Sequence, residues 1–135
     1  MIRVLAIDHV VLRTTDVERL AGFYSDILGC QVERTLPAET GLTQLRAGDA
    51  LIDIVDVNSE LGRRGGGPPG EEGNNLDPFC LRIGPADEKE LIAWLKARGI
   101  EAGPVETHYG ADGFGPSLYL ADPDGNVVEL RPQGS

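Results

Sequence analysis

Hydrophobic and polar positions divide the chain into two halves that repeat one order of predicted elements. Residues 7–14 (IDHVVLRT) and 76–83 (LDPFCLRI) both resemble strands, and they share an Asp, a Leu and an Arg at matching places. Apolar residues at helical spacing follow each of them. The third place of the two strands differs, because it holds His9 in the first half and Pro78 in the second.

Residue types that start and stop helices frame both predicted helices. Asp16 stands where an N-cap residue belongs in the first half, and Asp87 or Ala86 opens the second helix. Gly29 and Gly99 stand where helices commonly end, in the left-handed conformation that glycine adopts readily. The pattern therefore predicts one helix in each half.

Short strand-like runs complete each half. In the first half they cover 30–35, 42–47 and 50–57, and in the second 100–105, 116–122 and 126–132. Asp53 and Glu129 lie at equivalent places in the last run of each half. The predicted unit is thus βαβββ, present twice, over about 1–57 and 76–135. The Gly- and Pro-rich residues 58–75 between the units read as a mobile linker, which we expect to gate a binding site together with 107–116.

Composition narrows the class of partner. A length of 135 residues with 41% hydrophobic residues suits a single domain. The net charge of −10 opposes binding to nucleic acid or to an anionic membrane surface, which leaves small molecules or proteins. No signal-peptide pattern or membrane-spanning run is present. Cys30 and Cys80 are expected to be reduced thiols in a cytoplasmic protein.

Three ionisable residues lie inside otherwise apolar strands: His9, Asp53 and Glu129. One such residue alone is more often a hydrogen-bonded or solvent-facing side chain than a functional one. The repeat changes this weighting, since pseudo-symmetric packing of two units would bring equivalent positions around one axis. Buried carboxylates are costly without a partner, so a shared cation or a water-filled cavity would explain them. Imidazole and carboxylate ligands suit a divalent ion such as Zn, Mn, Ni, Fe or Mg.

The stretches IDHVVLRTTDVERLAGFYSDILG, ALIDIVD and ADPDGNVVEL resemble the vicinal oxygen chelate superfamily, which includes glyoxalases, bleomycin resistance proteins and extradiol dioxygenases. The resemblance covers nearly the whole chain apart from the linker. It implies an α+β fold in which two βαβββ modules form a cupped eight-stranded mixed sheet with the helices outside. It also implies a metal held by His9, Asp53, the place of Pro78, and Glu129, with Glu129 taking the catalytic role.

The sequence departs from that family pattern at two places. Pro78 has no donor atom, and Asp53 stands where the family usually has a longer or aromatic ligand. We therefore expect one divalent metal ion to be weakly held or absent. Two functions stay open: a metal-dependent lyase, isomerase or dioxygenase acting on a small oxygen-containing substrate, and a metal-free module that binds a drug or another small molecule. A purely structural protein is a third and weaker alternative.

Four further residues are candidates for substrate contact: His108, Tyr109, Phe114 and Tyr119. The resemblance places the Gly-rich segment after His108 in a loop at the mouth of the cup, although a surface histidine and ordinary packing of the aromatic residues explain them as well. Ser117 lacks the context of a serine nucleophile. The resemblance also implies a homodimer, which would cover exposed strand edges.

Overall fold

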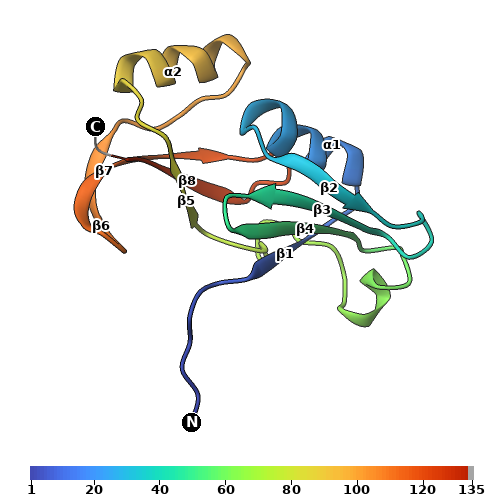
Figure 1. Ribbon diagram of the computed structural model, residues 1–135. Helices are drawn as coiled ribbons and strands as arrows, with labels where there is room; N and C mark the ends of the chain where they lie inside the picture. Colours follow the sequence, from blue (N-terminus) through green and yellow to red (C-terminus); the bar gives the residue numbers. More distant parts are fainter. Residues whose placement is uncertain (134–135) are drawn as a thin grey trace. The chain divides into compact units, whose positions relative to one another are not determined.

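The computed structural model describes residues 1–133, in two compact units, one of residues 1–75 and one that begins at Leu76. Each unit contains a four-stranded mixed sheet and a helix, and each is described by itself (Figure 1). The predicted α+β fold of two βαβββ modules is confirmed, with the eight strands divided between two four-stranded sheets. No helix in the described part of the chain is long and apolar enough to cross a membrane.

The first unit follows the predicted order of elements. These are β1 (His9–Thr14), α1 (Val17–Gly22), the π-helical turn η1 (Phe23–Ile27), β2 (Gln31–Thr35), β3 (Leu42–Ala47), β4 (Ala50–Asp56) and the short 3₁₀ helix η2 (Gly62–Arg64). The strands lie in the order β1-β4-β3-β2, with β1 parallel to β4 and the other pairs antiparallel. Asp16 caps α1 by accepting a hydrogen bond from the backbone N–H of Arg19 at 3.1 Å, and Gly29 has a φ of +74°.

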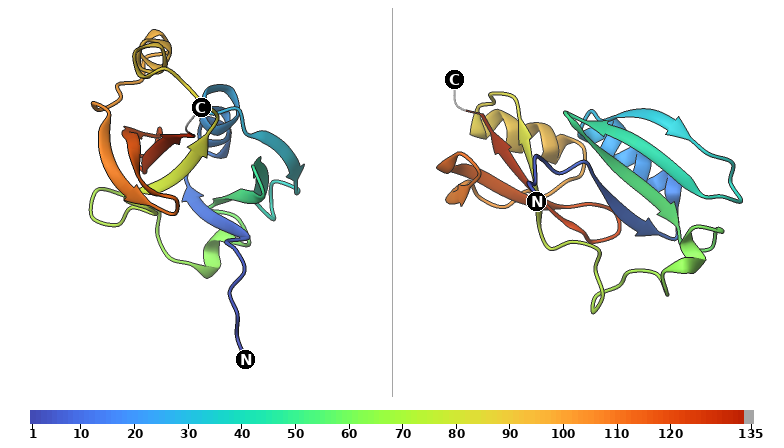
Figure 2. Two further views of the ribbon diagram at one scale, coloured as in Figure 1. Left: turned by 60° about the vertical axis from the view of Figure 1, so that its left-hand side comes forward. Right: turned by 60° about the horizontal axis from the view of Figure 1, so that its bottom comes forward.

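The core of the first unit lies between its helix and its sheet. Leu20, Phe23 and Tyr24 are buried on the helical segment. Because side chains alternate across a strand, every second residue of the sheet faces them. The buried sheet residues on this side include Leu12, Leu45, Ile52 and Ile54. In Figure 2 the helical segment runs along one face of this sheet. The opposite face carries His9, Gln44 and Asp53.

Residues 58–75 belong to the first unit. Beyond η2, the Asn75 side chain makes a pair of hydrogen bonds with the backbone of Arg13, accepting from its N–H and donating to its carbonyl, both at 3.0 Å. The Arg13 guanidinium also donates to the Gly66 carbonyl at 2.6 Å. Residues 58–75 are thus hydrogen-bonded to β1 at two places, at Gly66 and at Asn75. The predicted gating by this segment stays a prediction.

The second unit repeats this order. Its elements are β5 (Phe79–Ile83), α2 (Glu88–Ala97), β6 (Glu106–Gly110), β7 (Gly113–Ala121) and β8 (Val127–Pro132). The strand order β5-β8-β7-β6 corresponds to that of the first sheet, again with one parallel pair at the edge. Asp87 caps α2 by accepting from the Glu90 N–H at 3.1 Å. Leu95 on α2 is buried, and the buried sheet residues of this unit include Leu118, Leu120, Val128 and Leu130.

The strand predicted at 100–105 is wrong. This segment is irregular, and the strand begins only at Glu106. Pro104 has no N–H to donate to a ladder, and the N–H of Gly103 is used by the Tyr119 carbonyl at 2.8 Å. The Gly-rich segment after His108, predicted as a loop, instead ends β6 and begins β7. His108 lies within β6, which forms a hairpin with β7.

Candidate functional site

The Glu129 carboxylate, on β8, lies at the centre of a polar cluster in the second unit. Cys80 on β5 and Tyr119 on β7 are its two cross-strand neighbours, and the charge of Glu129 contributes to the raised pKa of both side chains. Ser117 precedes Tyr119 by two residues, so its side chain lies on the same face. Its hydroxyl donates to Glu129 Oε2 at 2.8 Å. The Ser117 hydroxyl therefore supplies this carboxylate with a hydrogen-bond donor from the protein.

His108 extends the cluster from β6. Its Nδ1 lies 2.6 Å from Ser117 Oγ, and its ring meets the Tyr119 ring edge-on at 5.2 Å. The Ser117 hydroxyl uses its single hydrogen in the bond that it donates to Glu129. In the bond between His108 and Ser117, the Nδ1–H of His108 is therefore the donor. His108 Nε2 lies 3.9 Å from a Glu106 carboxylate oxygen. In this order of donors both hydrogen bonds run toward Glu129, and His108 does not accept the proton of Ser117.

The environment of the cluster keeps its weak acids protonated. Burial, followed by the charge of Glu129, raises the pKa of the Cys80 thiol to about 11. The same two causes raise the pKa of the Tyr119 phenol. A thiolate or phenolate beside a carboxylate is disfavoured by repulsion between like charges. The Cys80 thiol is therefore protonated near neutral pH and is a poor nucleophile.

Arg131 fixes the β6–β7 hairpin that carries His108. Its buried guanidinium donates to the carbonyl of His108 at 3.1 Å and to that of Gly113. A Cβ atom at Gly110 or at Gly115 would lie 2.8 Å from this guanidinium, so both positions need glycine for the close approach. Arg82 pairs with Asp112 at the hairpin tip, at 2.7 Å.

The first unit places His9 and Asp53 on one face of its sheet. His9 Nδ1 lies 2.7 Å from Asp8 Oδ1, and the pKa of His9 is raised by that hydrogen bond first and by the charge of Asp53 second. Asp53 is buried and accepts from Gln44 Nε2 at 3.2 and 3.3 Å. Neither carboxylate of the predicted ligand set thus lacks a hydrogen-bond donor from its own unit.

The two units have the same register at the candidate positions. Val11 pairs with Asp53, and Cys80, its equivalent in the repeat, pairs with Glu129. They differ where Pro78 replaces His9. The Leu51 N–H donates to the Asp8 carbonyl, whereas the Val127 N–H donates to that of Leu76, one place further back. The strand β5 begins after Pro78, which offers no ligand atom.

The predicted aromatic residues fall into two groups. His108 and Tyr119 join the Glu129 cluster. Tyr109 and Phe114 lie on the other face of the hairpin, 74% and 77% exposed, with ring centroids 5.0 Å apart. The sequence analysis did not select Ser117, Cys80 or Arg131 as site residues. Ser117 and Tyr119 share the alternation of one strand, and that was the only signal in the sequence that linked them.

A bound divalent metal ion needs several His, Cys, Asp or Glu side chains that converge on one point. Within the described part of each unit, no group of three His, Cys, Asp or Glu side chains could hold a metal ion. Zinc in catalytic sites commonly has three protein ligands. The residues within a single unit therefore do not fit a bound divalent ion.

Comparison with known proteins agrees with this fold. A family model for the Glyoxalase/Bleomycin resistance protein/Dioxygenase superfamily matches residues 6–130. The chain belongs to this superfamily. A curated member, virulence protein STM3117 of Salmonella typhimurium, is 28% identical over 127 residues, which cover 92% of this chain and 81% of that protein.

Two solved structures of similar fold carry different functional names. An antibiotic binding protein, TnmS3 from a Streptomyces species, is 24% identical with a TM-score of 0.71 over 99% of this chain and 100% of its own. Lactoylglutathione lyase from Agrobacterium tumefaciens is 22% identical with a TM-score of 0.64, over 94% of this chain and 92% of its own. At these identities the likeness establishes the fold, and function has to be argued from the site.

Proposed function

We propose that this protein binds a small organic molecule at the Glu129 cluster without the help of a metal ion. One observation carries the proposal: the Glu129 carboxylate accepts a hydrogen bond from Ser117 and lies beside Cys80 and Tyr119 on the neighbouring strands. The Ser117 hydroxyl stabilises this partly buried carboxylate without a cation. The place equivalent to His9 in this unit holds Pro78, which adds no ligand.

The chemistry of the cluster favours a particular class of ligand. An ionised carboxylate has about four acceptor sites, so Glu129 keeps acceptor capacity for a ligand N–H or O–H. Glu106 adds a second carboxylate beside His108. The rings of His108 and Tyr119 offer aromatic surface. The guanidinium of Arg131 is buried and used by backbone carbonyls, so it does not favour an anion. The class proposed is a planar molecule, neutral or cationic, that donates hydrogen bonds.

A matched pair of probes tests this class. Tryptamine and indole-3-acetate share a ring system but carry opposite charges. In NMR titrations we expect tryptamine to shift the His108 and Tyr119 resonances with saturation, and indole-3-acetate to leave them unchanged. Glu129→Gln should weaken tryptamine binding about tenfold or more, because a charge-assisted hydrogen bond contributes about 1.5–3 kcal/mol. Glu101→Gln, at an exposed position outside the cluster, is the control. Equal binding of tryptamine by Glu129→Gln would refute the proposal.

A metal-dependent enzyme is the second candidate, supported by His9 and Asp53 on one face of the first sheet. The sequence predicts His9, Asp53 and Glu129 as the ligands of such an ion, which would supply Lewis-acid chemistry to a substrate oxygen. Equilibrium dialysis against Zn²⁺ and Mn²⁺ separates the two candidates. We expect less than one equivalent retained by the natural chain and more by Pro78→His. Tight retention by the natural chain, with no gain in Pro78→His, would favour the enzyme.

The proposal includes a cytoplasmic homodimer. Cys30 and Cys80 are both free thiols, which suits a reducing compartment. The edge strand β2 is exposed along its whole length, and such edges are commonly covered by a partner. Sedimentation equilibrium at micromolar concentration tests the dimer, since one chain has a mass of 14.4 kDa.

A further inference from the structure

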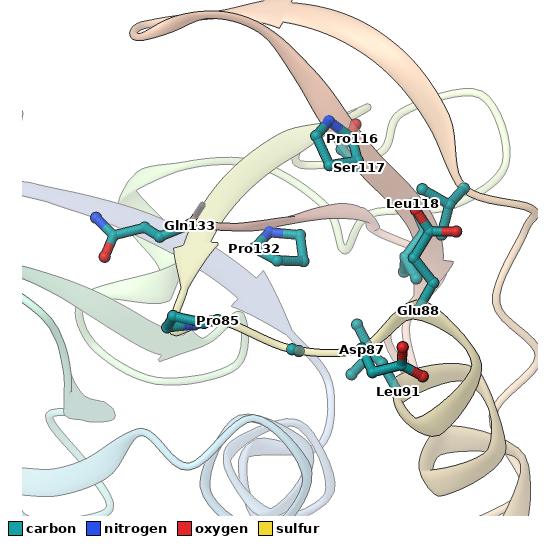
Figure 3. Close-up of a pocket in the computed structure, with 11 residues that line it drawn as sticks. Pro85, Asp87, Glu88, Leu91, Pro116, Ser117, Leu118, Pro132 and Gln133 are labelled. Carbon is teal, nitrogen blue, oxygen red and sulfur yellow. The ribbon is translucent and has the colours of Figure 1, made fainter. Parts of the chain in front are cut away.

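A cavity of about 460 Å³ lies beside α2 in the second unit. Its apolar walls come from Leu91 on α2, Val105 before β6, Pro116 and Leu118 on β7, and Pro132 on β8. In Figure 3 the side chains of Leu91 and Leu118 approach each other from the helix and the sheet. All of the lining residues belong to this unit, and we call the cavity the α2 groove.

The volume of the α2 groove suits a small molecule. Small-molecule sites are concave, enclose about 300–1,000 Å³, and combine apolar walls with a few polar groups. A folded protein partner instead covers about 800 Å² of a broader surface. The groove therefore has the dimensions of a site for a small ligand.

The α2 groove is separate from the Glu129 cluster. Side chains alternate across a strand, so Pro116 and Leu118 lie on the opposite face of β7 from the Ser117 side chain. Ser117 borders the groove, but its hydroxyl donates to Glu129. Neither Glu129 nor His108 is a lining residue. A molecule in the groove would thus not need the Glu129 carboxylate.

The rim of the α2 groove is negatively charged. Asp87 and Glu88 line it at the start of α2, and none of the described residues that line it is a Lys or an Arg. Figure 3 shows both carboxylates at the α2 end of the cavity. A helix N-terminus carries only about half a positive charge, which two carboxylates outweigh. The chain as a whole has a net charge of −10, so its field also attracts cations.

An apolar strip continues from the groove to the tip of the β6–β7 hairpin. Phe114, Pro116 and Leu118 alternate along β7 and so lie on one face. Tyr109 of β6 pairs with Phe114, and both rings are exposed and in contact. Since residues two apart on a strand are separated by about 7 Å, Phe114 lies within reach of a long tail that begins in the groove. Exposed apolar surface of this kind is typical of binding sites.

We propose that the α2 groove binds an amphiphilic cation, which is a molecule with an apolar tail and an ammonium group. The tail would contact Leu91, Pro116 and Leu118, and the ammonium group would lie against Glu88 and Asp87. Burial of the tail supplies most of the free energy of binding, and the carboxylates select the sign of the charge. A fatty acid of the same length would bring a third negative charge to the rim. This site is additional to the Glu129 cluster and does not depend on the function proposed for it.

Probes that differ in charge and in tail test this class of ligand. Octyltrimethylammonium is neither planar nor a hydrogen-bond donor, so it falls outside the class proposed for the Glu129 cluster. In NMR titrations of the whole chain it should shift the methyl resonances of Leu91, Val105 and Leu118 with saturation. Octanoate and tetramethylammonium should leave these resonances unchanged, because the first has the wrong charge and the second has no tail. Shortening the tail to hexyl should weaken binding about tenfold, since two fewer methylene groups are buried.

Matched variants test the acidic rim. Glu88→Gln should weaken the binding of octyltrimethylammonium about two- to fivefold, which is the effect of one exposed ion pair. Adding Asp87→Asn should weaken it further, and Asn at this position can still cap α2. Glu90→Gln is the control, because it removes the same charge from the same turn of α2 at a residue that does not line the groove. It should leave the binding unchanged.

A filled groove provides a second test. Val105→Phe would place a larger side chain in the cavity and should abolish saturable binding. Val32→Phe makes the same change at an exposed position of β2 and should leave the binding unchanged. Circular dichroism of each variant checks that the fold is retained. Retained binding in a folded Val105→Phe variant would overturn the proposal, and the charge variants decide if Val105→Phe does not fold.

Other outcomes would also overturn the proposal. Binding of octanoate as tight as that of octyltrimethylammonium would do so, as would equal losses in Glu88→Gln and Glu90→Gln. Shifts that never saturate, or that are confined to His108 and Tyr119, would do the same. Groove resonances that change on dilution of the free protein would show that a second copy covers the groove, against the proposal. Loss of tryptamine binding with octyltrimethylammonium binding intact would affect only the proposed function.

Discussion

The two units share one topology and one register, but they differ in how their helices pack. The first unit buries Leu20, Phe23 and Tyr24 on its helical segment against the sheet. In the second unit Leu95 is the only fully buried residue among those described on α2, while Trp94 is 40% exposed beneath the Arg98 guanidinium. The second helix borders a cavity. The two units therefore share one topology but differ in how the helix packs on its sheet.

The sheet faces that carry Asp53 and Glu129 also differ between the two units. Asp53 in the first unit accepts from the amide of Gln44, whereas Glu129 in the second accepts from the Ser117 hydroxyl and lies beside Tyr119 and Cys80. The place that holds His9 in the first unit holds Pro78 in the second. A carboxylate with one hydroxyl donor keeps acceptor capacity for a ligand. Four predictions test this contrast.

The largest expected effect compares the two helices. Leu20→Ala should reduce the free energy of unfolding by about 2–5 kcal/mol, because Leu20 is fully buried and leaves a cavity. Leu91→Ala should reduce it by about 1 kcal/mol or less, since Leu91 already borders a cavity. Urea denaturation of both variants measures the difference. Equal losses would mean that the two helices contribute alike.

The second prediction concerns the reactivity of Cys80. Its pKa of about 11, against an ordinary value of 9.0, lowers the thiolate fraction about 100-fold at pH 8. Because only the thiolate is alkylated, iodoacetamide should react slowly with this partly exposed residue until the pH rises toward 11. Glu129→Gln should speed the reaction about tenfold by removing the negative charge. Mass spectrometry of the Cys80 peptide follows the rate, and the buried Cys30 is an internal reference. An unchanged rate would mean that the charge of Glu129 does not influence the pKa of the Cys80 thiol.

The third prediction concerns the hairpin of the second unit. Arg131 corresponds in the repeat to Val55, so the first unit has no such guanidinium. Arg131→Met should lower the free energy of unfolding by about 2 kcal/mol, because the carbonyls of His108 and Gly113 lose their hydrogen-bond donor. Hydrogen exchange of the β6–β7 amides should accelerate more than that of β5. Uniform acceleration across the unit would argue against a local clamp.

The smallest effect is the titration of His9. Asp8 raises the pKa of His9, so the protonated imidazole persists to higher pH than in an ordinary histidine. Asp8→Asn should therefore lower the pKa toward 6.5, and Asp53→Asn should lower it by less, because Asp8 is the larger cause. NMR titration of the ring protons reads both values. A larger shift in Asp53→Asn would make Asp53 the main partner.

Local residue chemistry made most of the fold predictable. Asp16 and Asp87 cap the helices, Gly29 and Gly99 follow them with positive φ, and the apolar alternation located β1, β3, β4 and β8. Each of these signals acts over a few residues, so it can be read along the chain. The strand predicted at 100–105 was misplaced. Its apolar composition suits a strand, but Pro104 has no N–H to donate to a neighbouring strand.

The sequence by itself determined that Asp53 and Glu129 are equivalent and that Pro78 cannot replace His9, because the repeat aligns them and proline has no donor atom. Only the tertiary structure decided what surrounds Glu129. Ser117, Cys80 and His108 come from three strands, and their approach depends on the register of the sheet. The cavity beside α2 is likewise visible only in the structure. The same holds for the division of the aromatic residues into two pairs, His108 with Tyr119 and Tyr109 with Phe114. Cross-strand neighbours and packing volume depend on residues far apart in the chain, and no local pattern specifies them.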